Sequence, residues 1–322
     1  MALRGATPTP RPLPRRVAVS GGAGFIGSHT VETLIAEGTQ VLVVDDLSHD
    51  CGVPLPAEAE LLEADCGDPA TATALLRFKP DAVLHLAARG GVNKVLRDPA
   101  THVRTAVASS IAFFKAAADA KVPSIVTASS GGAVYGDART LPARESLTPA
   151  PRSQYGASKA AEEAYLGSFR RLAGMRTLAL RYGNVYGPRQ DGTGEAGVVA
   201  ISCTKLLAGE APVIRGDGLQ TRDFVFVGDV AAANLAALRS NRAGAVNVGT
   251  GRETSVDTVV TTLANLHSSG LAPLHEEAAQ GEVRRGCLDT NRARRWLHWQ
   301  AHTAIEQGLR QTLDWFQSAS AR

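Results

Sequence analysis

The amino-acid sequence predicts an α/β protein in which a doubly wound, mostly parallel β-sheet is accompanied by a smaller mixed α/β domain. Two observations lead to this prediction. Short aliphatic and β-branched runs alternate with helix-forming stretches over most of the 322 residues, which is typical of parallel strands joined by crossover helices. In addition, the first of these runs ends in a cluster of glycines that opens a helix, as nucleotide-binding β-α-β units do.

The first β-α-β unit is the strongest local signal. The stretch "RRVAVSGGAGFIGSHTVETLIAEGTQVLVVDDLS" begins at Arg15 and reads as a buried strand, a glycine turn, a helix and a second strand. Its glycines satisfy both Gly22-x-Gly24-x-x-Gly27 and Gly21-x-x-Gly24-x-x-Gly27. Such positions let the backbone turn tightly and approach a pyrophosphate, which then lies at the positive end of the helix dipole. The alternative is an ordinary tight turn without a ligand.

Acidic residues follow two of the predicted strands. Asp45, eighteen residues beyond Gly27, is placed to accept hydrogen bonds from a ribose diol and to repel a 2′-phosphate, which favours NAD over NADP. Asp46 is either a second cofactor contact or a loop acid that caps backbone amides. Asp65 either accepts from an adenine amino group or caps a helix within "DCGDP".

The alternation continues along the chain. Each of four further stretches predicts a strand, and helical stretches separate them: "AELLEAD" at 59–65, "DAVLHLAA" at 81–88, "PSIVTASS" at 123–130 and "RTLALRYGN" at 176–184. The ligands of such a sheet bind beyond the carboxyl ends of its strands, where "HLAA" and "ASS" fall.

These elements suggest an interleaved domain organisation. We predict a sheet domain over residues 15–181, to which segments near 219–250 return, and a substrate domain over residues 182–318. Two later strands, "DFVFV" and "AVNVG", lie in the returning segments. Residues 1–14 contain four prolines and are predicted to be a disordered leader.

Composition excludes several classes of function. The net charge is +3 and the basic residues are scattered, apart from residues 11–16 and 284–295, so we expect no nucleic-acid partner. No apolar run approaches the roughly 20 residues of a membrane span, so we expect no membrane partner. The four cysteines show no metal-ligand or pairing pattern, which favours reduced thiols, a cytoplasmic location and no bound metal.

The stretch "YGASKAAEEAYLGSF" carries the candidate catalytic pair. Tyr155 and Lys159 are four residues apart in a sequence of strong helix formers, so both side chains lie on one helical face. A neighbouring ammonium stabilises a phenolate, which suits a general base. In isolation, an incidental pair on a solvated helix would explain the spacing equally well.

Several short motifs, taken together, indicate one protein family. The sequence contains "GGAGFIGSH", "VVDDLS", "HLAA", "SSGGAVYG", "YGASK", "RYGNVYGPRQ", "GDGLQTRDFVFVGDVA" and "VNVGTG" in this order. They resemble the motifs of the extended short-chain dehydrogenase/reductase family, and most of all those of its UDP-glucose 4-epimerases and related nucleotide-sugar epimerases. The resemblance runs from about Arg15 to Phe316 and implies a Rossmann-type NAD domain.

The resemblance also implies a reaction. A sugar nucleotide would bind between the two domains, and Tyr155 as phenolate would take the proton of the sugar 4-hydroxyl while the C4 hydride passes to NAD. The 4-keto sugar would rotate and receive the hydride on its other face. Ser130 would hydrogen-bond the same sugar oxygen, and Lys159 would hold the nicotinamide ribose. Helices around residues 100–121 and 153–173 would form a homodimer.

Site residues follow from position in these motifs. The predicted cofactor-binding residues are Gly21, Gly24, Phe25, Ile26, Gly27, Asp45, Asp46, Leu47, Ser48, Asp65, Cys66, Leu86, Ala87, Ala88, Tyr155, Lys159 and Tyr182. The predicted substrate-binding residues are Ser130, Asn184, Val198, Ile214, Arg222 and Glu282. For Arg222 the alternative is a buried ion pair with Asp223 or Asp229, and for Asn184 it is a turn residue. His85 and His102 match no catalytic motif and are interpreted as structural.

The sequence departs from the family pattern at four places. Counting back from "VYG", the position that usually holds the catalytic hydroxyl is Gly131, whereas counting back from Tyr155 gives Ser130; Ser130 is preferred over Ser129, which faces the other side of the strand. An asparagine usual before the next helix is replaced by Thr105-Ala106. The usual Arg-x-Gly-Asp reads Ala279–Glu282, so Arg284 or Arg285 is the remaining candidate for a second diphosphate arginine. Gly286 stands where some relatives have a bulky tyrosine, which predicts a larger sugar pocket and admits an N-acetylated hexosamine.

Alternative functions make different demands on these positions. The related 4,6-dehydratases and decarboxylases place acids between the hydroxyl residue and "VYG", where this sequence has Gly132 and Ala133. A 4-ketoreductase would need exchangeable NADPH, which Asp45 disfavours. A non-catalytic NAD-binding protein would be expected to have lost Tyr155 or Lys159, and both are present.

Overall fold

The computed structural model describes residues 11–88, 98–193, 197–268, 270–278 and 283–320. Seven parallel strands form the main sheet of this described part, in the spatial order β11-β6-β5-β4-β1-β2-β3. They are β1 (Arg16–Ser20), β2 (Gln40–Asp45), β3 (Glu60–Glu63), β4 (Ala82–His85), β5 (Ser124–Ser130), β6 (Arg176–Tyr182) and β11 (Gly244–Val248). The predicted fold class, a Rossmann-type doubly wound sheet, is confirmed.

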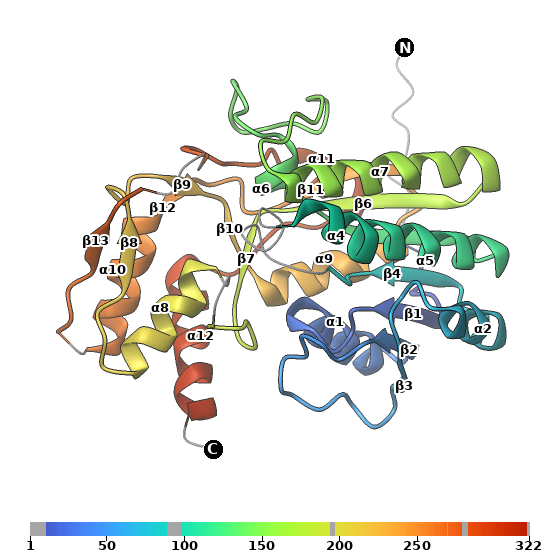
Figure 1. Ribbon diagram of the computed structural model, residues 1–322, viewed down its shortest axis with the longest axis horizontal. Helices are drawn as coiled ribbons and strands as arrows, with labels where there is room; N and C mark the ends of the chain where they lie inside the picture. The colour runs from blue at the N-terminus through green and yellow to red at the C-terminus, as the bar shows by residue number, and fades with distance from the viewer. Residues whose placement is uncertain (1–10, 89–97, 194–196, 269, 279–282, 321–322) are drawn as a thin grey trace, which may run out of the picture.

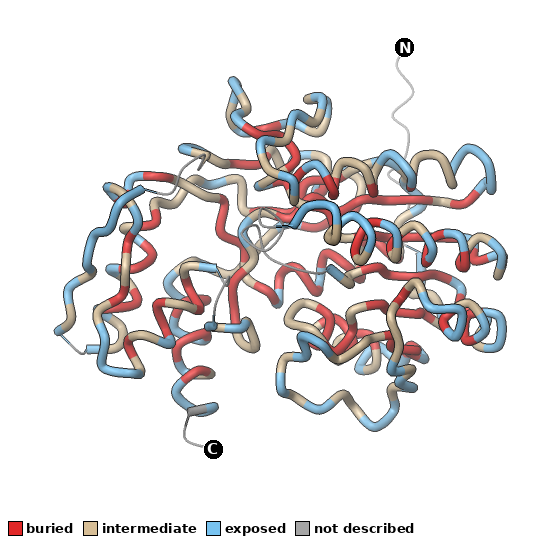
Figure 2. Tube along the Cα trace, in the orientation of Figure 1, coloured by how far each residue is buried: buried red, intermediate tan, exposed pale blue. Residues whose placement is uncertain are grey.

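Helices cover both faces of the sheet (Figure 1). One face packs against α1 (Phe25–Ala36), α9 (Val227–Arg239) and α11 (Asn291–Leu297), and the other against α2 (Pro69–Phe78), α5 (Ala108–Asp119) and α7 (Gln154–Ala173). The alternation of side chains along a strand explains the two cores. In β1, Val17 and Val19 enter the first core, whereas Ala18 enters the second, and buried residues run along the strands in Figure 2.

The chain reverses its direction across the sheet between β1 and β4. It proceeds outward from β1 through β2 to β3, then returns to place β4 on the other side of β1. The carboxyl ends of β1 and β4 therefore diverge into loops on opposite sides, which leaves a crevice at this point. The glycine turn before α1 and the loop after β4 both border that crevice.

A second body of structure lies beside the sheet (Figure 1). It contains α8 (Val198–Leu207), α10 (Val256–His267) and α12 (Ile305–Ser320), packed around a core of Cys203, Leu206, Leu263, Leu309 and Leu313. Three two-stranded pairs complete it: β7 (Asn184–Tyr186) with β10 (Phe224–Phe226), β8 (Val213–Arg215) with β13 (Leu274–Glu276), and β9 (Thr221–Arg222) with β12 (Thr254–Ser255). Shorter elements are α4 (Pro99–His102), the π-helix η1 (Val103–Val107) and α6 (Gly131–Val134).

Two contacts bear on the predicted domain boundaries. Residues 1–10 lie outside the described residues, but Leu13 packs against the first core and the Pro14 carbonyl accepts from Thr39, so the packed chain already includes the end of the predicted leader. Helix α11 was assigned to the substrate domain, yet Ala293 and Leu297 join the core beneath the sheet. Its sequence, "NRARRWLHW", is rich in arginine, but Ala293, Trp296 and Leu297 are spaced as one helical face, and this face packs on the core.

His85 links the sheet to the helix layer as a neutral side chain. Its ring Nε2 lies 2.9 Å from the Ser110 hydroxyl, which itself donates to the Ala106 carbonyl. Nε2 therefore donates its hydrogen, and Nδ1 accepts from the Ser20 hydroxyl at 2.6 Å. The ring stacks on Phe113. Burial, together with the nearby Lys159 ammonium, lowers the pKa of His85 to about 3, so the interpretation of this histidine as structural agrees with its surroundings.

This neutral histidine predicts acid sensitivity of the fold. Below pH 6.5 the unfolded chain binds a proton at this residue, whereas the folded chain does so only near pH 3. The contribution to the free energy of unfolding is therefore complete above pH 6.5 and falls by about 1.4 kcal/mol per pH unit on the way down. We expect the free energy of unfolding, measured by urea unfolding at a series of pH values across this range, to fall less steeply with decreasing pH in His85→Gln than in the native protein. If both proteins lost stability equally steeply, the assignment of His85 as a buried neutral residue would be wrong.

Candidate functional site

The glycine turn between β1 and α1 forms a cradle with two kinds of glycine. A Cβ on Gly21, which has a positive φ of 73°, would lie 2.5 Å from the Ala87 amide nitrogen. A Cβ on Gly27 would lie 1.9 Å from the Gly21 carbonyl oxygen, so neither position has room for a side chain. A Cβ on Gly24 would meet its nearest atom, the Gly21 oxygen, at 3.5 Å, which is an ordinary contact. The first two glycines therefore hold the loop against β4 and α1, and Gly24 leaves its surface open.

A cavity extends from this cradle along the carboxyl ends of β1, β2, β3 and β4 to the start of α7. Most predicted cofactor residues line it: Gly21, Gly24, Phe25, Ile26, Gly27, Asp45, Asp46, Ser48, Asp65, Cys66, Leu86, Ala87, Ala88, Tyr155 and Lys159. Glycines, two separate strand-end acids and an apolar floor suit a dinucleotide with a pyrophosphate in the middle. We call it the cofactor cavity.

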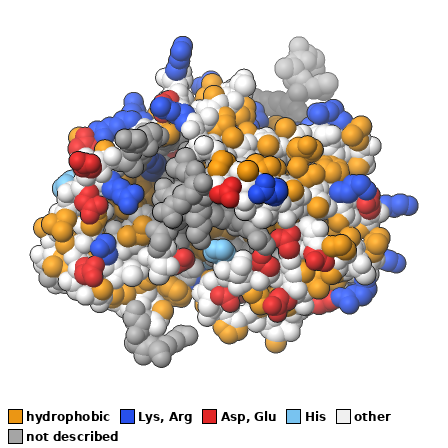
Figure 3. Space-filling view, viewed as in Figure 1, with side chains coloured by type: hydrophobic (Ala, Val, Ile, Leu, Met, Phe, Trp, Pro, Cys, Tyr) orange, Lys and Arg blue, Asp and Glu red, His pale blue; other side chains and the backbone are white. Residues whose placement is uncertain are grey.

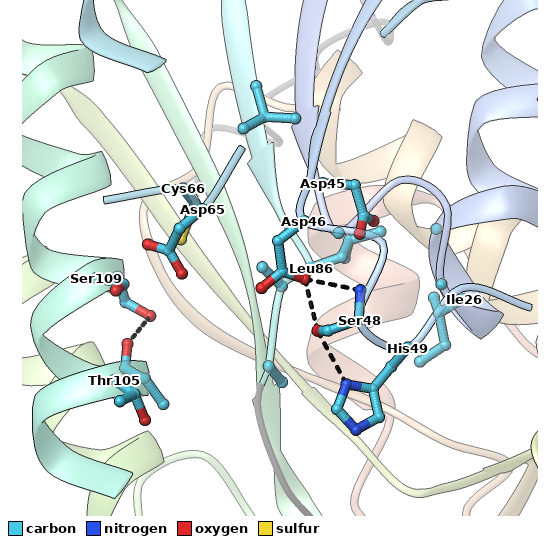
Figure 4. A pocket seen from close by; sticks show the side chains of 18 of the residues that line it. Ile26, Asp45, Asp46, Ser48, His49, Asp65, Cys66, Leu86, Thr105 and Ser109 are labelled. Carbon is cyan, nitrogen blue, oxygen red and sulfur yellow. Dashed lines mark hydrogen bonds between the residues drawn. The ribbon is translucent and has the colours of Figure 1, made fainter. Parts of the chain in front are cut away.

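Acidic side chains approach the cofactor cavity from two strand ends (Figure 4). Asp45 holds the glycine turn, because its carboxylate accepts from the Ala23 and Leu47 amides at 2.9 Å each. Burial raises the pKa of Asp45, and these two amides oppose the rise. Asp46 accepts from the Ser48 amide and hydroxyl, so it caps the loop and lines the cavity at once.

Asp65 is also anchored to local backbone. It accepts from the Gly67 amide at 2.7 Å, while α2 is capped by Asp68, whose side chain accepts from the Ala70 amide. The helix-capping role in "DCGDP" thus belongs to Asp68. Asp65 remains on the cavity wall, where an adenine contact was predicted.

The candidate catalytic pair stands at the inner end of the cofactor cavity. Helix α7 begins after Ser153, whose hydroxyl accepts from the Gly156 amide. A Cβ on Gly156 would lie 2.6 Å from the Ala133 carbonyl oxygen, so the first turn of α7, which carries Tyr155, packs closely on α6. Lys159 lies one turn further, with its Nζ 2.9 Å from Glu162 Oε2.

The two serines at the end of β5 have different environments. Ser129 is buried, and its hydroxyl donates to Glu163 at 2.5 Å. Glu163 also receives two hydrogen bonds from Arg181. Ser130 is partly exposed and precedes α6. A Cβ built on Gly132 would lie 3.9 Å from the Ser130 hydroxyl and 3.3 Å from Asn184 Oδ1, so both side chains border this turn.

Gly131 has a packing reason for lacking a side chain. A Cβ there would lie 2.7 Å from both terminal carbons of Leu288, a buried residue that reaches the turn from a distant segment. A hydroxyl residue at Gly131 would fit only if Leu288 moved aside. This long-range contact explains why the hydroxyl stands one position earlier than the usual count.

Two further cavities meet at the predicted substrate residues. The inner cavity lies beside the turn after Ser130 and is lined by Gly131, Gly132, Tyr135, Gly183, Val283, Arg285, Gly286 and Leu288, among others. The outer cavity lies toward α8 and is lined by Val185, Gln190, Val198, Val199, Phe224 and Val256, among others. Asn184 and Arg222 line both cavities.

Arg222 lies at the junction of these two cavities. Its guanidinium donates to the Thr221 carbonyl at 2.8 Å. Asp223 accepts from the Thr250, Gly251 and Leu288 amides, and Asp229 accepts from the amides of 302 and 303. Both carboxylates that are the alternative partners of Arg222 accept from backbone amides, and Asp223 also accepts from the Thr250 hydroxyl.

Several predicted contacts need correction. The Tyr182 side chain is in the sheet core, where its hydroxyl donates to Asn234 at 2.5 Å, so it does not face the cofactor cavity. Ile214 is fully buried against Val256 and Val260. Leu47 contributes its amide to Asp45 but does not contribute to the cavity lining. Glu282 and its neighbours 279–281 lie outside the described residues.

The two arginines considered as replacements are placed differently. Arg284 forms an ion pair with Asp217 on the surface. Arg285 pairs with Glu253 at 2.5 Å and also lines the inner cavity with Arg222 and Gly286. Of the two, Arg285 is therefore the one placed to contact a ligand of the inner cavity.

Sequence reasoning missed part of the cofactor cavity. His49, His102, Ser109, Ser110 and Glu162 also line it, with Thr105 and Ala106 of η1. His102, interpreted as structural, is half-buried there, and its pKa is lowered by burial and by the Lys159 charge. The spacing of Glu162, three residues after Lys159 on one helix face, was a signal that could have identified it. Among the described residues, no cluster of histidine, cysteine or acidic side chains is suited to hold a metal ion.

A comparison with protein-family models identifies the family of this protein. The model of the "NAD dependent epimerase/dehydratase family" matches residues 17–249. The chain belongs to this family, which confirms the predicted family and NAD as its cofactor.

Individual relatives of this chain have more specific descriptions. A UDP-glucose 4-epimerase of Mycolicibacterium smegmatis is 39% identical over 95% of this chain and 99% of its own length. A solved UDP-glucose 4-epimerase of Thermotoga maritima with UDP-glucose has a TM-score of 0.92 and 37% identity, and the match covers 95% of this chain and 99% of that one. A Thermus thermophilus UDP-glucose 4-epimerase in complex with NAD has a TM-score of 0.88 and 36% identity, with 94% and 99% covered.

Proposed function

We propose that this protein inverts the C4 configuration of a nucleotide sugar, most favourably a UDP-hexose, with NAD held in the cofactor cavity. One observation carries the choice of reaction. The turn after Ser130, which borders the inner cavity, consists of Gly131, Gly132 and Ala133 and offers no titratable side chain. Elimination or decarboxylation needs such a group, whereas oxidation and re-reduction at C4 need only one base and one hydroxyl.

The side chains divide this reaction among themselves. NAD, when bound, accepts a hydride and returns it. Tyr155 takes the proton of the sugar 4-hydroxyl and later gives it back, and the Lys159 ammonium beside it stabilises the phenolate. The Ser130 hydroxyl donates to the same sugar oxygen as that oxygen loses its proton. The 4-keto sugar would turn between the two transfers.

The substrate would lie across the two cavities, with its diphosphate at their junction. Arg222 and Asn184 line both, and a guanidinium binds a diphosphate through two parallel hydrogen bonds. The outer cavity, with Val198 and Phe224, would take the nucleoside, and Arg285 would supply a second cation. Gly286 lines the inner cavity without a side chain, which favours admission of an N-acetylated hexosamine.

Arg222→Leu is expected to raise KM for the UDP-sugar by about 10- to 100-fold, because it removes charge-assisted hydrogen bonds to the diphosphate. Binding of NAD should be unchanged. Steady-state kinetics would measure the effect, with Arg284→Leu as the matched control because Arg284 pairs with Asp217 away from the cavities. An Arg222→Leu enzyme with a native KM would show that the diphosphate lies elsewhere.

The deciding experiment is direct. The purified protein is incubated separately with UDP-glucose, UDP-N-acetylglucosamine and UDP-glucuronate, and the C4 epimers are resolved by NMR. We expect inversion of at least one of them. No inversion of any would refute the proposed reaction, and a 4-keto-6-deoxy or a pentose product would instead favour a dehydratase or a decarboxylase.

We also propose that the protein is a cytoplasmic homodimer. Hydrophobic side chains gather over α5 and α7 in Figure 3, where Val103, Tyr165 and Leu172 are exposed. Exposed alanines at 112 and 164 would let two such helix pairs pack closely. The four cysteines are free thiols, and no helix in the described ranges is long and apolar enough to span a membrane. Sedimentation velocity would test the dimer.

A further inference from the structure

A buried ion pair adjoins the candidate catalytic tyrosine. Lys159 Nζ donates to Glu162 Oε2 at 2.9 Å, and the two side chains are only 6% and 4% exposed. Both residues line the cofactor cavity, Lys159 about one helical turn and Glu162 about two turns beyond Tyr155. A carboxylate in this position is not needed to build α7, whose first turn is already capped by Ser153.

The protonation of Lys159 depends on this carboxylate. Burial alone lowers the pKa of a lysine, because the charged form loses its hydration. At Lys159 burial acts in that direction, but the charge and hydrogen bond of Glu162, aided by Tyr155, outweigh it and raise the pKa. A buried cation without its counterion would be costly, typically by several kcal/mol, so the ammonium would tend to lose its proton.

Other groups near Lys159 do not replace Glu162. Cys66 faces it from the loop after β3, His85 from β4 and His102 from the end of α4. Burial and the Lys159 charge lower the pKa of both histidines, while the Glu162 charge opposes this at His102, and neither histidine can supply the negative charge that Glu162 provides. The adjacent acid, Glu163, is bound to Arg181 and Ser129 instead.

We propose that Glu162 is a positioning residue of the reaction: it fixes the Lys159 ammonium in place and keeps it protonated, and through Lys159 it sets the pH range in which Tyr155 exchanges its proton with the substrate. This role rests on the proposed function of Tyr155 and Lys159. Glu162 itself reaches neither reacting atom in the proposed reaction. Its effect is electrostatic: the negative charge of Glu162 offsets the positive charge of Lys159 near the Tyr155 phenol.

The test is the pH profile of kcat in Glu162→Gln. Without the carboxylate, the Lys159 ammonium acts unopposed on the phenol, so turnover should begin at lower pH. The same ammonium, now buried without a counterion, should lose its proton earlier, so turnover should also end at lower pH. We expect the whole profile to move toward acid by about one pH unit. A kcat profile that covers the same pH range as that of the native protein, whatever its maximal kcat, would overturn the proposal.

Two variants separate positioning from structure. Glu162→Asp retains the charge and should restore the native profile at least in part. Glu163→Gln removes the neighbouring buried acid and its bond to Arg181, so it should lower thermal stability without shifting the profile. An equal shift in Glu163→Gln would show that any buried charge on α7 has the effect, and would overturn the specific role of Glu162.

A second readout does not require turnover. Ultraviolet difference absorbance records tyrosinate formation in the NAD-loaded protein, and the curve of Tyr155→Phe is subtracted to isolate Tyr155. Glu162→Gln should form this tyrosinate at lower pH than the native protein. If no nucleotide sugar is inverted but this shift is present, the proposed reaction fails while the coupling holds. If inversion occurs and the shift is absent, the role of Glu162 fails alone.

Discussion

Tyr155→Phe should lower kcat for C4 inversion by about 10³-fold, because it removes the group that takes and returns the 4-hydroxyl proton, and positioned acid-base catalysis contributes about 10² to 10⁴. The ring remains to fill its place at the start of α7, and the cradle of Gly21, Gly24 and Gly27 is untouched. Bound NAD should therefore be retained in full. Turnover is followed by NMR of the epimers, and NAD is measured after denaturation of the purified variant.

A matched control comes from the same helix. Tyr165 lies ten residues further along α7 and is 48% exposed, so Tyr165→Phe should leave kcat unchanged. Lys159→Met should weaken NAD binding as well as turnover, since Lys159 is predicted to hold the nicotinamide ribose. A Tyr155→Phe enzyme within tenfold of native kcat would refute the role of Tyr155 as the base.

The parts of the fold that sequence could predict are those governed by local rules. Glycines followed by a helix, with Asp45 at the next strand end, define the cofactor side through residues that are close in the sequence. The spacing of Tyr155 and Lys159 is likewise local, and both do lie on the cofactor cavity. Strand periodicity located β1, β2, β4, β5 and β6 through their buried apolar residues, whereas β3 (Glu60–Glu63) is mostly exposed and contains only two apolar residues.

What sequence could not predict depends on contacts between distant segments. Tyr182 ends a strand that points to the cavities, but the alternation of the strand turns its ring into the core toward Asn234. Gly131 lacks a side chain because Leu288, more than 150 positions away, fills the space. Helix α11 completes the core beneath the sheet although its sequence is rich in arginine. The contact between Gly131 and Leu288 has no local sequence signal.

The Ser-Ser-Gly-Gly stretch at 129–132 combines both kinds of constraint. Ser129 belongs to a buried network with Glu163 and Arg181, which fixes the end of β5. A Cβ built on Gly132 would lie 3.9 Å from the Ser130 hydroxyl and 3.3 Å from Asn184 Oδ1, so these two side chains border the turn. The missing side chain at Gly131 makes room for Leu288. This contact does not explain the absence of an acid at Gly132 and Ala133, since a Cβ on Gly132 would not meet Leu288.

Gly27→Ala and Gly24→Ala should fail in different ways. A Cβ at Gly27 would lie 1.9 Å from the Gly21 carbonyl oxygen, so α1 could not remain where it packs against the sheet, and we expect a loss of about 3 kcal/mol or more in the free energy of unfolding. A Cβ at Gly24 meets only ordinary contacts, at 3.5 Å and beyond. It would, however, occupy the surface that the pyrophosphate approaches.

Thermal unfolding with and without added NAD separates the two effects. Gly24→Ala should melt like the native protein freed of NAD and should gain little from added NAD, since binding is lost by at least about tenfold and ligand stabilisation falls with it. Gly27→Ala should melt well below both. The contrary outcome is a Gly27→Ala protein that melts like the native protein and binds NAD normally. Glycine at this position would then not be required by the close packing of α1 on the glycine turn. The distinction between Gly27 as a structural glycine and Gly24 as a ligand-facing one would be wrong.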